Sequence, residues 1–242
     1  MQDSPKAAKV STKAVKESDR TLAQGTQWNY FNKLNLLLNK AEREEIIPFN
    51  PVDRLEKGER PQRADPRCTF LVLDEVKRLA DTPFRMDKLK RAFLFACLCG
   101  LRISDVRSLQ WNSFQQDSKG NTIAKLTQKK TKSILYLPIS PEALKQLPPK
   151  GNDVDLVFGK LPDNSYIDKL LKIWAKDARI TKNLTFHVSR HTFATLSITY
   201  GAELYTVSKL LGHADIKTTQ IYADVINEKK RDAVNSIPSI MD

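Results

Sequence analysis

The sequence has no long apolar run and few cysteines. No stretch approaches the roughly 20 apolar residues that a membrane-spanning helix needs, and the N-terminal residues 1–6 have no apolar core behind their charges, so we expect neither a membrane span nor a secretory signal. The three cysteines are an odd number, and Cys97 and Cys99 lie in an apolar segment where cysteine acts as a small hydrophobic residue. These absences favour a cytoplasmic protein with reduced thiols.

The usual motifs for bound nucleotides and zinc are also missing. A glycine-rich G-x-x-x-x-G-K-[ST] phosphate loop is absent. His187 and His191 have the spacing of a zinc-binding helix, but Val188 stands where a metalloprotease carries glutamate, and no cysteine or acidic pair with ligand spacing accompanies them. The sequence therefore predicts no metal and no cofactor.

Basic residues are present in excess. Forty lysines and arginines face 28 aspartates and glutamates, which gives a net charge of +12. A surplus of this size favours a polyanionic partner, and nucleic acid is the first candidate. Charge by itself does not distinguish a DNA-binding protein from an RNA-binding protein, or from a basic protein that binds neither.

The N-terminal quarter differs in composition from the rest. Residues 1–20 are rich in lysine, serine and alanine, which predicts a flexible basic arm. A helical segment is expected within residues 21–57 and should end before Pro48. One face of this helix is predicted to carry Trp28, Phe31, Leu34, Leu38 and Ala41. Residues 58–68 combine charge with two prolines and predict a linker to a main domain at 69–242.

The main domain is predicted to be mainly α with a small antiparallel β-hairpin. Helices are expected at 74–80, at 87–99 with Gly100 as the stop, and from about residue 165 onward with breaks at 181–183, 201 and 212. The segments 122–127 and 134–138 have the composition of strands. The polar residues between these strands form a hairpin tip that is rich in lysine.

Three short segments of the main domain carry a recognisable pattern of basic residues, followed by a tyrosine. They are Gly100-Leu101-Arg102-Ile103-Ser104-Asp105, then His187-Val188-Ser189-Arg190-His191-Thr192-Phe193-Ala194-Thr195, then Leu210-Leu211-Gly212-His213, and finally Tyr222. Their order and spacing resemble the motif boxes of the tyrosine recombinase (phage integrase) family over about residues 70–230. The resemblance implies the catalytic fold of that family, preceded by a shortened remnant of its helical core-binding domain.

The resemblance also implies a role for each motif residue. Tyr222 matches the nucleophile that attacks a DNA phosphate, and Arg102 and Arg190 match the pair that clamps the phosphate oxygens. His187 matches a residue that binds the phosphate and helps to take the tyrosine proton, and His213 matches a second phosphate donor. Two further residues are expected to act behind the site: Asp105 by orienting Arg102, and His191 as a structural interior histidine.

Elementary chemistry explains why the reaction needs these residue types. Attack on a phosphodiester builds negative charge on the non-bridging oxygens, and guanidinium groups stabilise that charge with paired hydrogen bonds. A phenol with a pKa of about 10 needs a base and a cationic field, and the 5′-hydroxyl leaving group needs an acid. By its position in the family hairpin, Lys130 is the expected acid, with Lys129 in reserve. The candidate DNA contacts are Lys129, Lys132, Lys209 and Lys217.

The resemblance implies double-stranded DNA as the substrate and a tetramer assembled on paired sites. Accessory DNA-bending proteins or a partner recombinase are possible partners, in association with a bacterial nucleoid. The apolar positions of residues 225–240 are expected either to dock on a neighbouring subunit or to pack on their own domain. Two alternatives stay open, a type IB topoisomerase and a catalytically silent DNA-binding accessory protein. Taken singly, Tyr222 could be a packed aromatic residue and Arg102 a surface charge.

Overall fold

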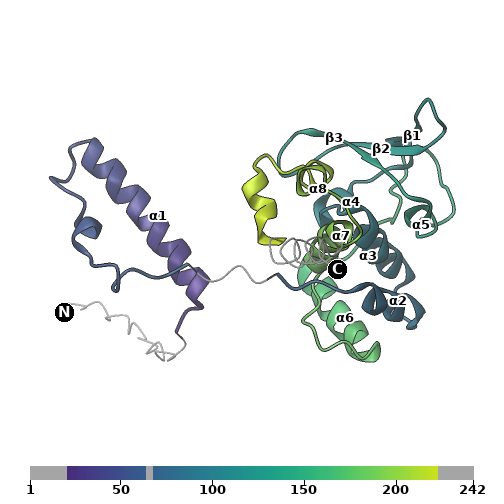
Figure 1. Cartoon of the computed structure of the whole chain (residues 1–242), viewed down its shortest axis with the longest axis horizontal. Helices are drawn as coiled ribbons and strands as arrows, with labels where there is room; N and C mark the ends of the chain where they lie inside the picture. The colour runs from purple at the N-terminus through teal and green to yellow at the C-terminus, as the bar shows by residue number, and fades with distance from the viewer. Residues whose placement is uncertain (1–20, 64–67, 223–242) are drawn as a thin grey trace, which may run out of the picture. The chain divides into compact units, whose positions relative to one another are not determined.

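The computed structural model describes residues 21–63 and 68–222. The chain divides into two compact units, residues 1–66 and 67–242, and each is considered by itself (Figure 1). Within the described ranges, no helix combines the length and apolar character needed to cross a bilayer. The expected basic arm at 1–20, residues 64–67 of the expected linker and the apolar segment at 225–240 lie outside the described residues.

In the N-terminal unit, the described residues 21–63 form one long helix and one short turn of 3₁₀-helix. Helix α1 spans Gln24–Arg43 and η1 spans Pro51–Arg54. Asn50 joins them, because its side-chain amide donates to Oδ1 of Asn35 at 2.7 Å and Oδ1 of Asn39 at 2.5 Å, while its own Oδ1 accepts from the backbone N–H of Val52. A single buried asparagine thus caps η1 and holds it against α1.

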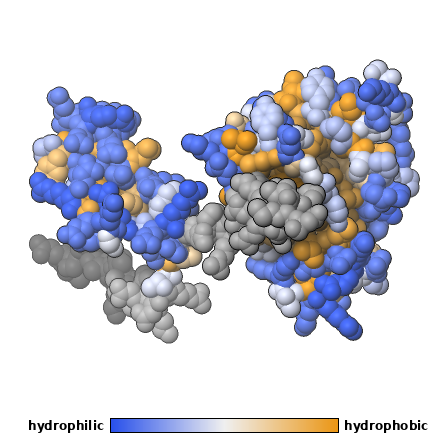
Figure 2. Space-filling model, viewed as in Figure 1, coloured by the Kyte–Doolittle hydropathy of each residue, from blue (hydrophilic) through white to orange (hydrophobic). Residues whose placement is uncertain are grey.

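The predicted apolar face of α1 is only partly covered. Four of its five residues are partly buried, whereas Leu34 is 51% exposed, and no residue of α1 is fully buried. Leu36 and Leu37 are also exposed, and Figure 2 shows hydrophobic patches on this unit. One helix and one turn offer too little surface to bury a whole helical face. The assignment of this unit as a core-binding segment stays a prediction.

The C-terminal unit is mainly helical with a small sheet, which confirms the predicted fold class. Between residues 68 and 222 its helices are α2 Leu73–Asp81, α3 Asp87–Cys99, α4 Ile103–Arg107, η2 Trp111–Ser113, α5 Pro141–Leu144, α6 Asn164–Asp177, α7 Phe186–Thr199, α8 Leu204–Leu211 and η3 Ile216–Tyr222. Its strands are β1 Phe114–Gln116, β2 Thr122–Thr127 and β3 Ile134–Pro138. Figure 1 shows α3 and α7 at the centre of the unit, with the strands along one edge.

The sheet is antiparallel in the order β1-β2-β3. The paired residues Ala124 and Leu137 are buried, whereas the next pair, Lys125 and Tyr136, is exposed, as expected for the two-residue period of a strand with one face on the core. Strand β1 was not predicted. It has only three residues and no β-branched side chain, and it forms because its backbone pairs with the edge of β2.

Aromatic packing fixes the beginning of α7. Trp174 of α6 and Phe93 of α3 are completely buried, and their rings meet edge to face at 5.9 Å between centroids. Phe93 makes a second edge contact with Phe186, the first residue of α7, at 5.8 Å. Burial of each such aromatic side chain stabilises the folded protein by about 1.5–3 kcal/mol. The packing of Phe186 in the core therefore fixes the position of the next residue of α7, His187.

Helix α3 ends at Gly100 as predicted, with φ of 72°. A β-carbon at this position would lie 2.5 Å from the Phe193 ring of α7. The left-handed turn and the close contact both call for glycine. They bring the segment that leads into α4 directly against α7.

Candidate active site

A cavity of about 230 Å³ lies where three distant parts of the chain meet. The turn between α3 and α4, the tip of the β2–β3 hairpin and the first turn of α7 each contribute to it. Four of the predicted site residues line this cavity: Arg102, Lys130, His187 and Arg190. The folded chain therefore brings two guanidinium groups, one ammonium group and one imidazole around a single hollow.

Arg190 is a buried cation held by backbone carbonyls. Its side chain is 3% exposed, and its Nη1 and Nη2 donate to the carbonyl oxygens of Gly100 at 2.8 Å and Leu211 at 2.7 Å. Burial, followed by the charge of Arg102, lowers the pKa of Arg190 to about 10, so the group stays protonated at neutral pH. These two bonds connect the ends of α3 and α8 and fix the direction of the guanidinium.

Arg102 has an unused hydrogen-bond donor. It lies immediately before α4, and its Nη1 is buried without a partner among the described residues. A buried donor that lacks a partner costs about 1–3 kcal/mol. An anion in the cavity would satisfy this donor with a charge-assisted hydrogen bond.

The expected role of Asp105 in orienting Arg102 stays a prediction. Among the described residues, Asp105 makes no hydrogen bond to Arg102. Instead its Oδ1 accepts from the backbone N–H of Lys129 at 2.9 Å, and its Oδ2 is buried without a partner. The carboxylate of Asp105 therefore binds the backbone of the β2–β3 hairpin. Its negative charge still acts on Arg190 through space, where it offsets part of the lowering of the Arg190 pKa by burial and Arg102.

Two histidines are held neutral near this cationic site. Partial burial, then the charges of Arg190, Arg102 and Lys130, lower the pKa of His187. His213 follows Gly212 at the end of α8, and its Nδ1 lies 2.8 Å from Oγ1 of the buried Thr219. Burial and the neighbouring arginines lower the pKa of His213 to about 4. His213 is not among the residues that line the cavity.

Tyr222 is buried behind the cavity and does not line it. Its side chain is 3% exposed and belongs to a small apolar cluster between α7, α8 and η3. Its hydroxyl lies 2.8 Å from Nδ1 of His191, and burial raises the pKa of the phenol above its usual value. The ring of His191 also meets the ring of His187 edge-on, at 4.5 Å between centroids. The three rings therefore contact one another in the order His187, His191, Tyr222.

The hairpin lysines differ in their surroundings. Lys130 is exposed and lines the cavity, whereas the expected reserve, Lys129, is held through its backbone by Asp105. Lys132 adopts the left-handed conformation, with φ of 59°. Lys132, Lys209 and Lys217 are all exposed, and none of them lines the cavity. Their role as DNA contacts stays a prediction.

Two buried polar residues of this region, Gln128 and Thr219, were not predicted from the sequence. Both have exposed fractions of 0%. The signal for Gln128 was present, because Ala124, Leu126 and Gln128 fall on the inward-facing positions of β2 and its continuation. A polar residue in line with apolar inward positions indicates a buried hydrogen-bonding role.

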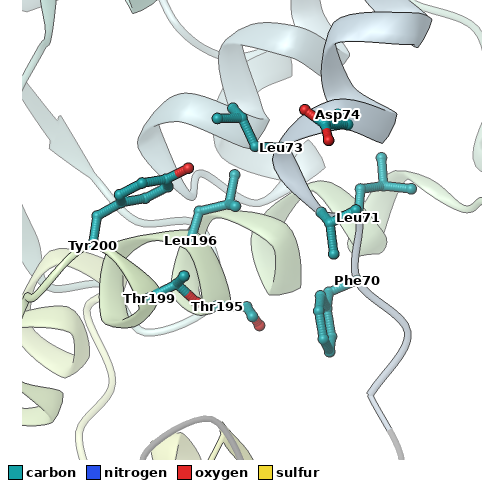
Figure 3. Close-up of a pocket in the computed structure, with 9 residues that line it drawn as sticks. Phe70, Leu71, Leu73, Asp74, Thr195, Leu196, Thr199 and Tyr200 are labelled. Atoms are coloured by element: carbon teal, nitrogen blue, oxygen red, sulfur yellow. The ribbon is translucent and has the colours of Figure 1, made fainter. Parts of the chain in front are cut away.

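A second hollow lies between the beginning of α2 and the C-terminal half of α7, and it has a different character. It measures about 280 Å³, and Figure 3 shows the side chains that surround it, among them Phe70, Leu71, Leu196 and Tyr200. Asp74 is its one charged lining residue. An apolar hollow with a carboxylate does not attract a phosphate.

Among the described residues, no three His, Cys, Asp or Glu side chains are grouped so that they could share a metal ion.

Comparison with known proteins agrees with this architecture. The tyrosine recombinase XerC of Caldanaerobacter subterraneus subsp. tengcongensis is 32% identical over 219 residues, covering 84% of this chain and 59% of the relative. The chain thus spans about three fifths of the length of that protein. The tyrosine recombinase XerD of Lacticaseibacillus casei is 30% identical over 230 residues, covering 88% of this chain and 77% of the relative.

A solved structure supports the fold itself. The integrase of transposon Tn1549, in complex with circular intermediate DNA, superposes with a TM-score of 0.64 at 18% sequence identity, over 86% of this chain and 79% of that chain. The sequence model described as the phage integrase family matches residues 69–229, which include the whole cavity and Tyr222. The C-terminal unit therefore has the tyrosine recombinase catalytic fold, and the chain belongs to the phage integrase family.

Proposed function

We propose that this protein cuts and rejoins double-stranded DNA at specific sites, through a covalent 3′-phosphotyrosyl intermediate formed by Tyr222. The observation that carries the proposal is the cavity in which Arg102, Lys130, His187 and Arg190 converge. Its cationic lining and the unpaired Nη1 of Arg102 suit a phosphodiester. The names of the relatives, as recombinases or integrases, support the same function.

Each of the four basic cavity residues has a task in the reaction, together with Tyr222. Arg102 and Arg190 hold the two non-bridging oxygens and stabilise the charge that develops on them. The phenol oxygen of Tyr222 attacks phosphorus while the bond to the 5′-oxygen breaks, and the Lys130 ammonium donates a proton to that oxygen. His187, which is neutral at pH 7, accepts the proton of the phenol. A 5′-hydroxyl of a second strand then reverses these steps.

The buried position of Tyr222 adds a step before chemistry. Its hydroxyl is bonded to His191, and the ring of His191 separates it from His187. The phenol has to leave His191 and enter the cavity before it can attack. Binding of DNA supplies the driving force for this movement only if the DNA-bound state makes contacts that the free protein lacks.

The same proposal covers the partners. Two duplexes and four subunits give each active site one phosphate to cut, and the reaction stores the bond energy in the phosphotyrosine without ATP. Accessory proteins, a partner recombinase and association with the bacterial nucleoid belong to this proposal too. A type IB topoisomerase or a silent accessory protein receives no support from the relatives described above, and both are outcomes of the experiment below.

Trapping on nicked DNA tests the function directly. Fragmented genomic DNA from the source organism is nicked at random, so that cleavage near a nick releases a short strand and leaves the protein attached to its site. Sequencing the attached DNA should give one recurrent site. A duplex built from that site should then form an adduct that resists SDS.

The Tyr222→Phe variant should form no adduct, while Tyr136→Phe, on the exposed face of β3, should react like the wild-type protein. Adduct formation by Tyr222→Phe would overturn the assignment of the nucleophile. Supercoil relaxation by a monomer without strand exchange would identify a topoisomerase, and binding without any adduct would identify an accessory protein.

A further inference from the structure

Gln128 is a fully buried side chain between the β2–β3 hairpin and the end of α8. Its exposed fraction is 0%, and its Nε2 donates to the carbonyl oxygen of Leu211 at 3.2 Å. The amide also packs so closely on Gly212 that a β-carbon there would overlap it. The hairpin and the residue before His213 are therefore in direct contact through one side chain.

The hairpin turn holds this amide in one orientation. Oγ1 of Thr131 donates to Oε1 of Gln128 at 2.8 Å, which leaves Nε2 directed at Leu211. The backbone of the same residue closes the turn, because Gln128 N donates to the carbonyl of Ser133 and Gln128 O accepts from Lys132, both at 2.9 Å. Lys130 lies inside this closed turn.

The carbonyl oxygen of Leu211 accepts hydrogen bonds from both Gln128 and Arg190. It accepts Nη2 of Arg190 at 2.7 Å as well as Nε2 of Gln128 at 3.2 Å. On the other side of the turn, Asp105 accepts the backbone N–H of Lys129. The backbone that carries Lys130 is thus anchored on both sides, and one anchor is the same atom that holds Arg190.

We propose that Gln128 is a positioning residue that fixes the distance between Lys130 and the phosphate held by Arg190. This inference rests on the proposed function and deepens it. Lys130 is an exposed side chain with several rotatable bonds, so its ammonium reaches the 5′-oxygen reproducibly only if its backbone is held in place. Loss of the Gln128 bond should therefore impair protonation of the leaving group more than capture of the phosphate.

The identity of the leaving atom separates these two effects. With oxygen at the 5′ position, the P–O bond breaks and its electron pair needs the proton of Lys130, since a hydroxyl has a pKa near that of water, about 15.7. With sulfur in the same place, the P–S bond breaks and a thiolate leaves without a proton, since a thiol has a pKa of about 8.5. Both substrates require the same two arginines.

Single-turnover cleavage of matched oxygen and sulfur duplexes, built on the trapped site, tests the proposal. Gln128→Met keeps the length of the side chain and removes its hydrogen bonds to Leu211, Thr131 and Ser133. Its cleavage rate on the oxygen duplex should be at least tenfold lower than that of the wild-type protein, and its rate on the sulfur duplex should stay within about threefold of wild type. Lys130→Ala should give the same pattern. Gln115→Met, on the exposed face of β1, is the control and should leave both rates unchanged.

Equal slowing on both duplexes, or no slowing on either, would overturn the positioning role. Thr131→Val covers the case in which Gln128→Met does not fold, because Thr131 is exposed and its hydroxyl bonds only to Gln128 and Ser133 of the same turn. It should slow oxygen cleavage at least threefold and spare sulfur cleavage, and unchanged rates in this variant would also count against the proposal.

Hydrogen exchange in the absence of DNA tests the tether independently of catalysis. Backbone amides of residues 128–133 should exchange at least tenfold faster in Gln128→Met, or in Thr131→Val where that variant replaces it, than in Gln115→Met. Unchanged exchange would overturn the tether. Failure of the wild-type protein to cleave either duplex would instead overturn the proposed function and leave the exchange result to judge Gln128.

Discussion

The Nδ1 atom of His191 lies 2.8 Å from the hydroxyl oxygen of Tyr222. His191 follows Arg190 directly on α7, so one helical turn holds both a cavity cation and the partner of the buried phenol. Burial and the charges of its neighbours lower the pKa of His191 to about 4, and the neutral ring can accept the phenol proton in a hydrogen bond. The free protein thus keeps its proposed nucleophile bonded and out of the cavity.

Removal of the acceptor at position 191 should destabilise the protein. His191→Phe keeps an aromatic ring but leaves the hydroxyl of Tyr222 buried without a partner, which should lower the free energy of unfolding by about 1–3 kcal/mol. Tyr222→Phe should cost less, because His191 is partly exposed and can bond to water. Urea denaturation of both variants and the double variant measures the coupling. Stability within about 0.5 kcal/mol of wild type for His191→Phe would contradict the bond.

Stability should fall as the pH is lowered from 7 towards 5. His191 and His213 have pKa values of about 4 in the folded protein, whereas an unfolded histidine titrates near about 6.5. Between these values the unfolded chain binds more protons, so acidification favours unfolding, while stability is fully present above about pH 7. Urea denaturation at pH 7.5 and pH 5.5 measures the effect. His213→Gln should flatten the profile, and an unchanged profile in that variant would show that His213 does not contribute.

Gly100→Ala should be more harmful than Gly120→Ala. Both glycines have positive φ, 72° and 79°, so each alanine pays about 1–2 kcal/mol for the left-handed conformation. Only at Gly100 does the new β-carbon collide with Phe193, which adds about 1–3 kcal/mol. Gly120 has open space around it. Thermal unfolding should therefore give a lower melting temperature for Gly100→Ala than for Gly120→Ala. Equal losses of stability would show that the space between Gly100 and Phe193 can accommodate a β-carbon.

Arg190→Lys should abolish most cleavage although it keeps the charge. Lysine cannot donate to the carbonyls of Gly100 and Leu211 and to a phosphate at the same time, since it lacks the planar fork of arginine. We expect adduct formation to fall by about 100-fold or more, with a loss of about 1–3 kcal/mol in stability. Arg78→Lys, exposed on α2, is the matched control and should behave like wild type. Near-normal cleavage by Arg190→Lys would remove this residue from the clamp.

DNA affinity should depend steeply on salt, and Lys132 should contribute to that dependence. Each phosphate contact releases counterions, so Lys132→Ala should reduce the slope of log K against log salt by about 1. Lys77→Ala removes the same charge from the exposed side of α2 and should leave the slope unchanged. Fluorescence anisotropy with a duplex of the trapped site, at several KCl concentrations, measures both slopes. An unchanged slope for Lys132→Ala would place that residue outside the DNA interface.

Local patterns in the sequence predicted most of the elements. Helix α3 begins and ends where its apolar run and Gly100 require, and β2 and β3 have the expected bounds, because helix stops and strand alternation depend on neighbouring residues alone. Strand β1 escaped prediction because a three-residue segment forms only through pairing with β2. Helix α1 was predicted correctly, but the burial of its apolar face depends on which other elements pack against it.

The sequence by itself determined the candidate site residues, because the motif boxes occur in a fixed order along the chain. Only the tertiary structure decided how they are used. Asp105 accepts the backbone N–H of Lys129, and Gln128 donates to the carbonyl of Leu211, 83 positions away. Tyr222 is separated from the cavity by His191. Such contacts depend on which donor lies nearest after the helices and hairpin have packed, and no local pattern contains that information.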